Sequence, residues 1–213
     1  MGKTVIGLLG LPGAGKTTAG EALADEYNTE LYRMGDVVRD SFAEVQENGI
    51  SVFPEAVQDS IHTAVSDESE VIPAETSSDS IGEWVTMMLD IHETVFAETA
   101  AKEITEEFES DIIIVDGIRT LSDIEAFKGR FERFELLHIY TPFVVRAERL
   151  IDRGREGEDE FDLSDVAERD ERELDWGVDK ILSQNTSSTF YNNSDSIDDF
   201  QSEIVTFTKT SVL

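Results

Sequence analysis

The chain has 213 residues, of which 47 are acidic and 17 basic, and its formal net charge is −30. This length fits one domain, or one domain with a sizeable insertion, and a hydrophobic share of 39% is enough for a core. The charge argues against binding to nucleic-acid backbones. The lack of cysteine excludes disulfides and thiolate-held zinc, and the three histidines show no metal-ligand spacing.

The acidic residues are spread from Glu21 to Glu203 rather than gathered in one tail. This pattern favours a folded protein with an acidic surface, as in halophilic organisms that keep molar salt in the cytosol, over a disordered acidic tail. The first apolar stretch is too short to span a bilayer, and a glycine-rich loop follows it at residue 10. We therefore expect a cytoplasmic protein without membrane contact.

A short apolar run over 4–9 predicts a buried strand, and the small and apolar residues after Lys16 predict a helix over 16–27. Between them lies GLPGAGKTT, which matches the G-x-x-x-x-G-K-[ST] phosphate loop. Its backbone amides and the helix N-terminus would cradle the phosphates of ATP, Lys16 would reach the β- and γ-phosphates, and Thr17 would ligate Mg²⁺. A glycine-rich turn without a ligand is the alternative. The expected nucleotide-binding residues are Gly10, Leu11, Pro12, Gly13, Ala14, Gly15, Lys16, Thr17 and Thr18.

Strand and helix patterns alternate along the rest of the chain, which predicts an α/β fold with a parallel sheet. Further strands are expected over 30–33, 112–116, 135–140 and 188–192. Further helices are expected over 36–48, roughly 80–108, 122–131, 143–153, 164–183 and 196–208.

The stretch 50–80 has a weaker pattern and contains two prolines. We expect helical pieces and loop here, within a helical insertion over 50–100 that lies on the acceptor side of the carboxyl edge of the sheet. The alternative is that this stretch is a solvent-exposed segment without a function.

The strand DIIIVDG ends in Asp116, as a Walker B strand does. Such a strand delivers a carboxylate beside the phosphate loop, where it can hold Mg²⁺ directly or through water. An aspartate that only caps the following turn is the alternative.

Apart from Arg33 and Arg39, every arginine lies between Arg119 and Arg172. Arginine grips phosphate with a planar fork of donors, so this grouping on an acidic chain suggests groups that stabilise a transferring phosphate. We expect ordinary ion pairs for Arg130, Arg133 and Arg146. For Arg169 and Arg172, ion pairs with the neighbouring acidic residues are at least as good an explanation as a ligand-binding role. Arg119 follows Asp116 by three residues, which favours a ligand-binding role.

Three segments resemble adenylate kinases: RMGDVVRD at 33–40, DGIRT at 116–120 with one residue fewer before its arginine, and a shortened lid start, RLIDRGREGED, at 149–159. The set is most similar to an archaeal group of P-loop proteins described as adenylate-kinase-related, whose members share Met-Gly-Asp-Val-Val-Arg, Asp-Gly-Ile-Arg and an Arg-Asp-x-Arg-Glu segment, here at 169–173. The similarity covers nearly the full chain except from Ile50 to about Glu98.

The resemblance implies a single nucleoside monophosphate kinase-like domain over 1–213, with five parallel strands in the order 2-3-1-4-5. It implies that Arg39 and Arg119 grip the phosphate of a nucleotide-like acceptor. Arg153 and Arg155, in a short lid over 153–163, would close over the γ-phosphate, and Thr17 and Asp116 would hold Mg²⁺.

Dephospho-coenzyme A kinases are a second family with similar features, including a C-terminal strand, asparagine and turn like STFYNNSDSIDDF. Their acceptor is a ribose hydroxyl, which requires a proton acceptor, and Asp36 is the candidate. Asp36 could equally be the N-cap of the helix over 37–48.

Two functions that need no phosphoryl acceptor remain as alternatives. The protein could be a nucleotide-dependent regulatory ATPase or switch, or a binding module that does not turn over its ligand. We expect a monomer or a small homo-oligomer that acts on a small molecule.

The acidic surface generates a prediction about salt. At 1 M salt the Debye length is about 3 Å, so repulsion between surface carboxylates is largely screened. Dialysis into dilute buffer should therefore reduce the helical circular dichroism signal, and a spectrum that does not change would contradict this expectation.

Overall fold

The computed structural model describes residues 2–73, 78–153, 162–184, 188–194 and 196–213. The chain divides into two compact units. We call Met1–Arg33 with Phe108–Leu213 the sheet unit, and Met34–Glu107 the helical unit. The helical unit contains the predicted insertion over 50–100 and extends beyond it at both ends.

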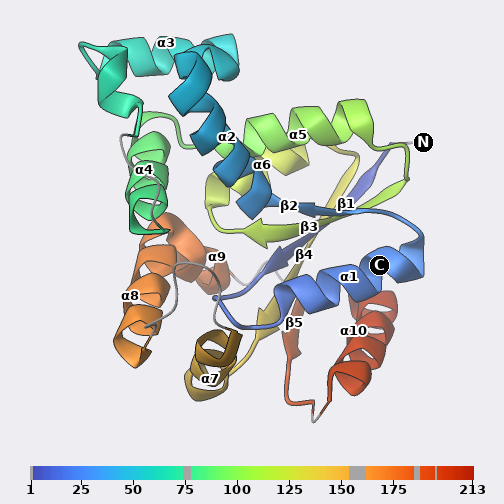
Figure 1. Cartoon of the computed structure of the whole chain (residues 1–213). Coiled ribbons are helices and arrows are strands. Elements are labelled where there is room, and N and C mark those ends of the chain that lie inside the picture. Colours follow the sequence, from blue (N-terminus) through green and yellow to red (C-terminus); the bar gives the residue numbers. More distant parts are fainter. Residues whose placement is uncertain (1, 74–77, 154–161, 185–187, 195) are drawn as a thin grey trace. The chain divides into compact units, whose positions relative to one another are not determined.

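The sheet has five parallel strands in the order β2-β3-β1-β4-β5, which confirms the predicted fold class and order (Figure 1). The buried strands at its centre consist largely of isoleucine, valine and leucine, as expected for strands covered on both faces. The strands are β1 (Thr4–Leu9), β2 (Leu31–Arg33), β3 (Ile112–Ile118), β4 (Arg133–Tyr140) and β5 (Ser188–Tyr191).

The helices of the sheet unit lie close to the predicted bounds, except that the predicted helix over 164–183 is interrupted. Gly177 has φ 124°, which a right-handed helix does not allow, so a π-helical turn separates two shorter helices. The elements are α1 (Lys16–Tyr27), α6 (Leu121–Arg130), α7 (Phe143–Arg153), α8 (Leu163–Glu173), the π turn η3 (Leu174–Val178), α9 (Asp179–Ser183) and α10 (Ile197–Ser211).

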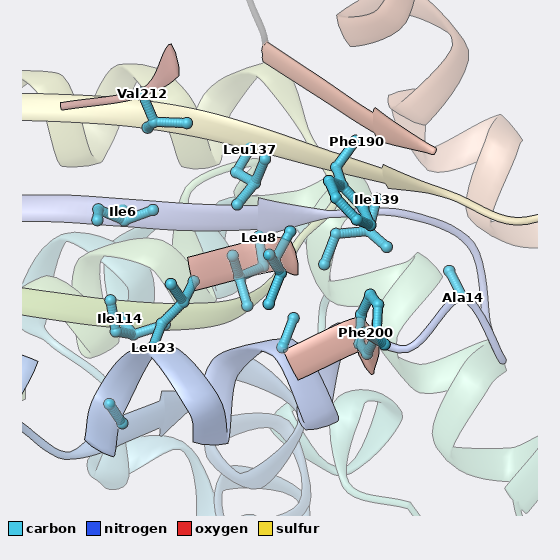
Figure 2. Close-up of a cluster of buried hydrophobic side chains, with 13 residues drawn as sticks. Ile6, Leu8, Ala14, Leu23, Ile114, Leu137, Ile139, Phe190, Phe200 and Val212 are labelled. Atoms are coloured by element: carbon cyan, nitrogen blue, oxygen red, sulfur yellow. The ribbon is translucent and has the colours of Figure 1, made fainter. Parts of the chain in front are cut away.

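One face of the sheet packs against α1 and α10, which lie side by side (Figure 1). Side chains alternate between the two faces of a strand, so Ile6 and Leu8 of β1 point into this layer with Leu23 of α1 and Phe200 of α10 (Figure 2). The other face is covered in part by α6, where Phe127 stacks on Phe134 of β4 with centroids 5.9 Å apart. These layers fix the carboxyl ends of β1, β3 and β4, and the phosphate loop leaves β1 at that edge.

The helical unit packs around an aromatic centre. Trp84 is 3% exposed, meets Phe42 edge to face, and donates its indole N–H to the carbonyl of Val71 at 2.9 Å. The elements are α2 (Met34–Asn48), the 3-10 turn η1 (Gly49–Val52), α3 (Glu55–Ala64), the 3-10 turn η2 (Glu68–Val71), α4 (Ser78–Ile91) and α5 (Val95–Glu107). The short elements between 50 and 80 agree with the predicted helical pieces.

The predicted single helix over roughly 80–108 is wrong, because α4 ends at Ile91 and α5 begins at Val95. Thr94 stands at the start of α5: its carbonyl accepts the Glu98 N–H, and its hydroxyl bonds to the Glu98 carboxylate at 2.6 Å. Apolar residues continue on both sides of this break, so helical periodicity alone does not reveal it. Within the described ranges, no helix has both the length and the apolar character needed to cross a bilayer.

A buried ion pair joins α7 to α8. Arg146 donates from Nη1 and Nη2 to the two carboxylate oxygens of Asp170, at 2.8 and 2.6 Å, and both residues are buried. The same guanidinium donates to the carbonyls of Pro12, at 2.9 Å, and Thr141, at 3.1 Å. The ion pair expected for Arg146 is therefore confirmed, and it also fixes the phosphate loop.

Replacing Asp170 by asparagine should lower the free energy of unfolding by about 3–5 kcal/mol, because the variant leaves the buried charge of Arg146 without a counter-ion. Urea denaturation in molar salt measures the change. The exposed neighbour Glu171→Gln is the control and should stay within about 0.5 kcal/mol of the parent. A loss in Asp170→Asn no larger than that of the control would contradict this stabilising role.

Candidate functional site

The phosphate loop has the conformation that its glycines permit. Gly13 and Gly15 have φ 78° and 101°, in the left-handed region where other residues are strained. A Cβ on Gly13 would also lie 2.7 Å from the carbonyl oxygen of Arg146, so no larger residue fits between the loop and α7. The loop closes with a bond from the Ala14 N–H to the carbonyl of Leu11 at 3.1 Å, and α1 then begins at Lys16.

Lys16 folds back over its own loop. Its Nζ donates to the carbonyl of Gly10 at 2.6 Å and to that of Leu11 at 3.3 Å. Burial lowers the pKa of Lys16, while the negative charges of Glu173 and Asp116 act in the opposite direction. A phosphate in the loop would offer this ammonium an anionic acceptor in place of a neutral carbonyl.

Thr17 and Asp116 meet as the predicted metal site requires. The Thr17 hydroxyl donates to Oδ2 of Asp116 at 2.8 Å, and Asp116 is 8% exposed near the carboxyl end of β3. Hydroxyl and carboxylate oxygens suit Mg²⁺, which keeps several waters and binds proteins through few ligands together with substrate phosphates. Among the described residues no group of three or more histidines and carboxylates could hold a metal alone. The pair therefore fits an ion that arrives with a nucleotide.

Asp116 does not cap the turn that follows it. Thr120 is the N-cap of α6 and forms a reciprocal capping box with Asp123. The Asp123 carboxylate also accepts the backbone N–H groups of Arg119 and Thr120, both at 2.9 Å.

A bulge in β3 places Arg119 next to the loop. The register of β3 against β1 shifts between Leu8 and Leu9, and Gly117, with φ 105°, is the extra residue. Such bulges redirect the side chains that follow them. Arg119 lies close enough to Lys16 for its charge to act on that residue, and Nη1 of Arg119 donates to the carbonyl of Gly117 at 3.3 Å.

Glu173, the last residue of the Arg-Asp-x-Arg-Glu segment over 169–173, pairs with Arg119. Its Oε1 lies 3.5 Å from Nε of Arg119, and the side chains are 4% and 24% exposed. Arg169 also acts on Lys16 through its charge. Asp170 and Glu173 are three residues apart on α8 and therefore share one side of the helix. That spacing is the signal in the sequence that could have pointed to them.

Asp36 and Arg39, predicted to bind the acceptor, both lie in the helical unit and form an ion pair with each other. About half of each side chain is exposed. Asp36 lies inside the first turn of α2, which begins at Met34, so its interpretation as an N-cap is wrong.

Arg153 is the last residue of α7. Arg155 and most of the predicted lid over 153–163 fall within 154–161, outside the described residues. Their proposed contact with the γ-phosphate stays a prediction.

Three further residues, which the sequence did not single out, hold the loop from the carboxyl edge. Nδ2 of Asn192 and the hydroxyl of Thr141 donate to the carbonyl of Ala14 at 3.0 and 2.9 Å. Arg149 reaches the carbonyl of Gly13 at 3.4 Å. Asn192 directly follows β5 and Thr141 directly follows β4, so only the sheet order brings them to the same carbonyl.

Comparison with known proteins shows the family of this chain. The family model described as "AAA domain" matches residues 9–167. A UPF0200 protein of Methanothrix thermoacetophila is 33% identical over 180 residues, which cover 84% of this chain and 82% of that protein.

Solved structures show the same fold at low sequence identity. The structure of TT1252 from Thermus thermophilus has a TM-score of 0.56 and 13% identity, over 99% of this chain and 100% of that one. Shikimate kinase from Acinetobacter baumannii, in complex with shikimate, has a TM-score of 0.50 and 16% identity, over 98% and 94% of the two chains. The sheet order and the phosphate loop thus belong to a P-loop kinase-like fold. The chain is a member of the UPF0200 family and carries the AAA domain of P-loop proteins over residues 9–167.

Proposed function

We propose that the protein is an ATP- and Mg²⁺-dependent kinase that transfers the γ-phosphoryl group to a nucleotide-like small molecule, in the manner of adenylate-kinase-related proteins. The observation that carries this proposal is the Thr17–Asp116 hydrogen bond beside Lys16, at the end of a phosphate loop. The kinase-like fold supports it.

Positioning and charge neutralisation would supply the catalysis, because phosphoryl transfer needs little covalent chemistry from the protein. Amides of the loop and of the first turn of α1 would bind phosphate oxygens. Lys16 would exchange its bonds to two carbonyls for bonds to the β- and γ-phosphates.

Mg²⁺, when bound with ATP, would neutralise the charge that develops on the phosphate oxygens. Thr17 and Asp116 would hold it, since their oxygens already adjoin at 2.8 Å. The buried ion pair of Arg146 with Asp170 keeps the loop in place during this exchange, because it bonds the Pro12 carbonyl independently of any ligand.

On the acceptor side we assign Arg119 and Arg39 to the acceptor's phosphate, and Arg153 and Arg155 to the γ-phosphate. Arg119 lies in the sheet unit with Lys16, and its charge acts on that residue. Its guanidinium can offer donors to phosphate while it stays beside Glu173, because that contact is made through Nε.

A second candidate is transfer to a ribose hydroxyl, as in dephospho-coenzyme A kinases. The segment after β5 favours it, because Asn192 stands directly after the strand and reaches the phosphate loop. A free hydroxyl needs a proton acceptor, whereas a phosphate acceptor is already nucleophilic at neutral pH.

Replacing Lys16 by alanine should reduce acceptor-dependent ADP release by about 10²-fold or more, because one charged donor to the transferring phosphate is lost. A coupled assay for ADP, run with and without a panel of nucleotide-like acceptors, measures this. Lys128→Ala, an exposed lysine on α6, is the matched control and should keep parental activity.

Three outcomes of this assay separate the functional classes. ADP release that depends on an acceptor supports a kinase. Slow release that no acceptor changes indicates a regulatory ATPase, and stabilisation by ATP without release indicates a binding module. Activity retained in Lys16→Ala would show that the donor site is elsewhere.

Replacing Asp116 by asparagine should raise the Mg²⁺ concentration needed for half-maximal activity by about 10–100-fold, because the isosteric amide is a weaker ligand. A Mg²⁺ titration of turnover at fixed ATP measures the shift. Asp111→Asn is the control, because Asp111 is exposed and directly precedes β3, the strand that carries Asp116. Equal Mg²⁺ requirements for the two variants would remove Asp116 from the metal site.

A further inference from the structure

Glu173 carries a carboxylate oxygen that no group of the described chain satisfies. Its Oε2 is buried and has no hydrogen-bond partner, while Oε1 lies 3.5 Å from Nε of Arg119. The side chain is 4% exposed. A π-helical turn begins at the next residue, Leu174, and such turns are frequent at functional sites.

Burying a carboxylate is costly unless hydrogen bonds replace those it made to water. The contact with Arg119 is too long to be a good hydrogen bond, and it leaves Oε2 without a donor. A donor supplied by a ligand would complete this site. Arg119 would remain beside it to balance the charge.

Glu173 belongs to the phosphate site rather than to the surface. Asp170, on the same side of α8, fixes Arg146 against the Pro12 carbonyl of the phosphate loop. Arg119, the partner of Glu173, follows the metal-site carboxylate Asp116 by three residues. One helix face thus reaches the loop through Arg146 at one position and contacts Arg119, just after β3, at the other.

We propose that Glu173 accepts the proton of the acceptor's hydroxyl group, so that the acceptor is a hydroxyl-bearing small molecule. This assignment rests on the second candidate function, kinase transfer to a hydroxyl group, and specifies its proton acceptor and substrate class. The hydroxyl proton moves to Oε2 of Glu173 as the hydroxyl oxygen bonds to the γ-phosphorus. The bond from that phosphorus to the β–γ bridging oxygen breaks, its electron pair leaves with ADP, and Glu173 then releases the proton to solvent.

Asp36 is the competing proton acceptor, and its surroundings suit the task less well. Its carboxylate is half exposed and already holds Arg39 in an ion pair one helical turn away. Glu173 instead has a buried oxygen without a partner among the described residues, and a hydrogen bond to a substrate hydroxyl is strong where the local dielectric is low.

The test compares Glu173→Gln with the exposed neighbour Glu171→Gln on the same helix. With hydroxyl-bearing acceptors, kcat of Glu173→Gln should fall by about 10²–10⁴-fold, the range for loss of a general base. The Kd for ATP should stay within about twofold, because glutamine keeps the volume of the side chain. Glu171→Gln should match the parent in both quantities.

A pH profile separates a proton acceptor from a merely structural carboxylate. Turnover of a hydroxyl acceptor by the parent should fall toward acid pH, and Glu173→Gln should lack that limb. Glu173→Asp should recover part of kcat, since it restores the carboxylate. If Glu173→Gln fails to fold, the acid limb of the parental pH profile and the partial activity of Glu173→Asp still test whether Glu173 accepts the proton. A parental pH profile without an acid limb would overturn the proposal.

Other outcomes also overturn it. If the parent transfers phosphate only to phosphate acceptors, the acceptor is not a hydroxyl group. If Asp36→Asn loses activity while Glu173→Gln stays active, Asp36 is the proton acceptor. If the parent binds ATP but turns over no acceptor, the proposed kinase function fails as a whole. Equal turnover of hydroxyl acceptors by the parent and by Glu173→Gln would refute the assignment of Glu173 alone.

Discussion

The donor site depends on one buried guanidinium. Arg146 bonds both oxygens of Asp170 and donates to the carbonyls of Pro12 and Thr141, so a single side chain joins α7, α8, the end of β4 and the phosphate loop. A glycine-rich loop has little stiffness of its own, because its residues gain much backbone entropy when released. The loop is kept in shape by contacts from outside, and Asn192 and Thr141 add to them at the Ala14 carbonyl.

Helix α8 connects this support to the end of β3. Asp170 reaches the loop through Arg146, and Glu173 reaches the end of β3 through Arg119. The two pairs differ in quality: the first is bidentate with short bonds, and the second is a single contact of 3.5 Å with an unsatisfied oxygen. The first pair therefore has the geometry of a stabilising contact, and the second leaves a buried oxygen without a donor.

The electrostatics of the molecule follow a similar division. The net charge of −30 would repel nucleotide phosphates if it were uniform. In the sheet unit, the charges of Arg119 and Arg169 instead act on Lys16, as do those of Asp116 and Glu173. A local group of cations beside buried carboxylates can bind a Mg²⁺–nucleotide complex on an otherwise acidic protein, because buried charges interact more strongly than screened surface charges.

The sequence by itself determined the features whose chemistry is local. The loop from Gly10 to Thr18, the strand that carries Asp116 and the alternation of strands and helices were all readable, because each depends on neighbouring residues, although β3 runs on to Ile118 rather than ending at Asp116. Resemblance to a known family supplied the strand order that the structure confirmed. Periodicity missed the break at Thr94, where apolar residues continue on both sides, and treated Gly177 as part of a helix although its φ is 124°. Only the tertiary structure decided which of 47 acidic side chains meet Arg146 and Arg119. Those partners, Asp170 and Glu173, lie on a helix distant in sequence, and burial selects them only once the sheet and helices are packed.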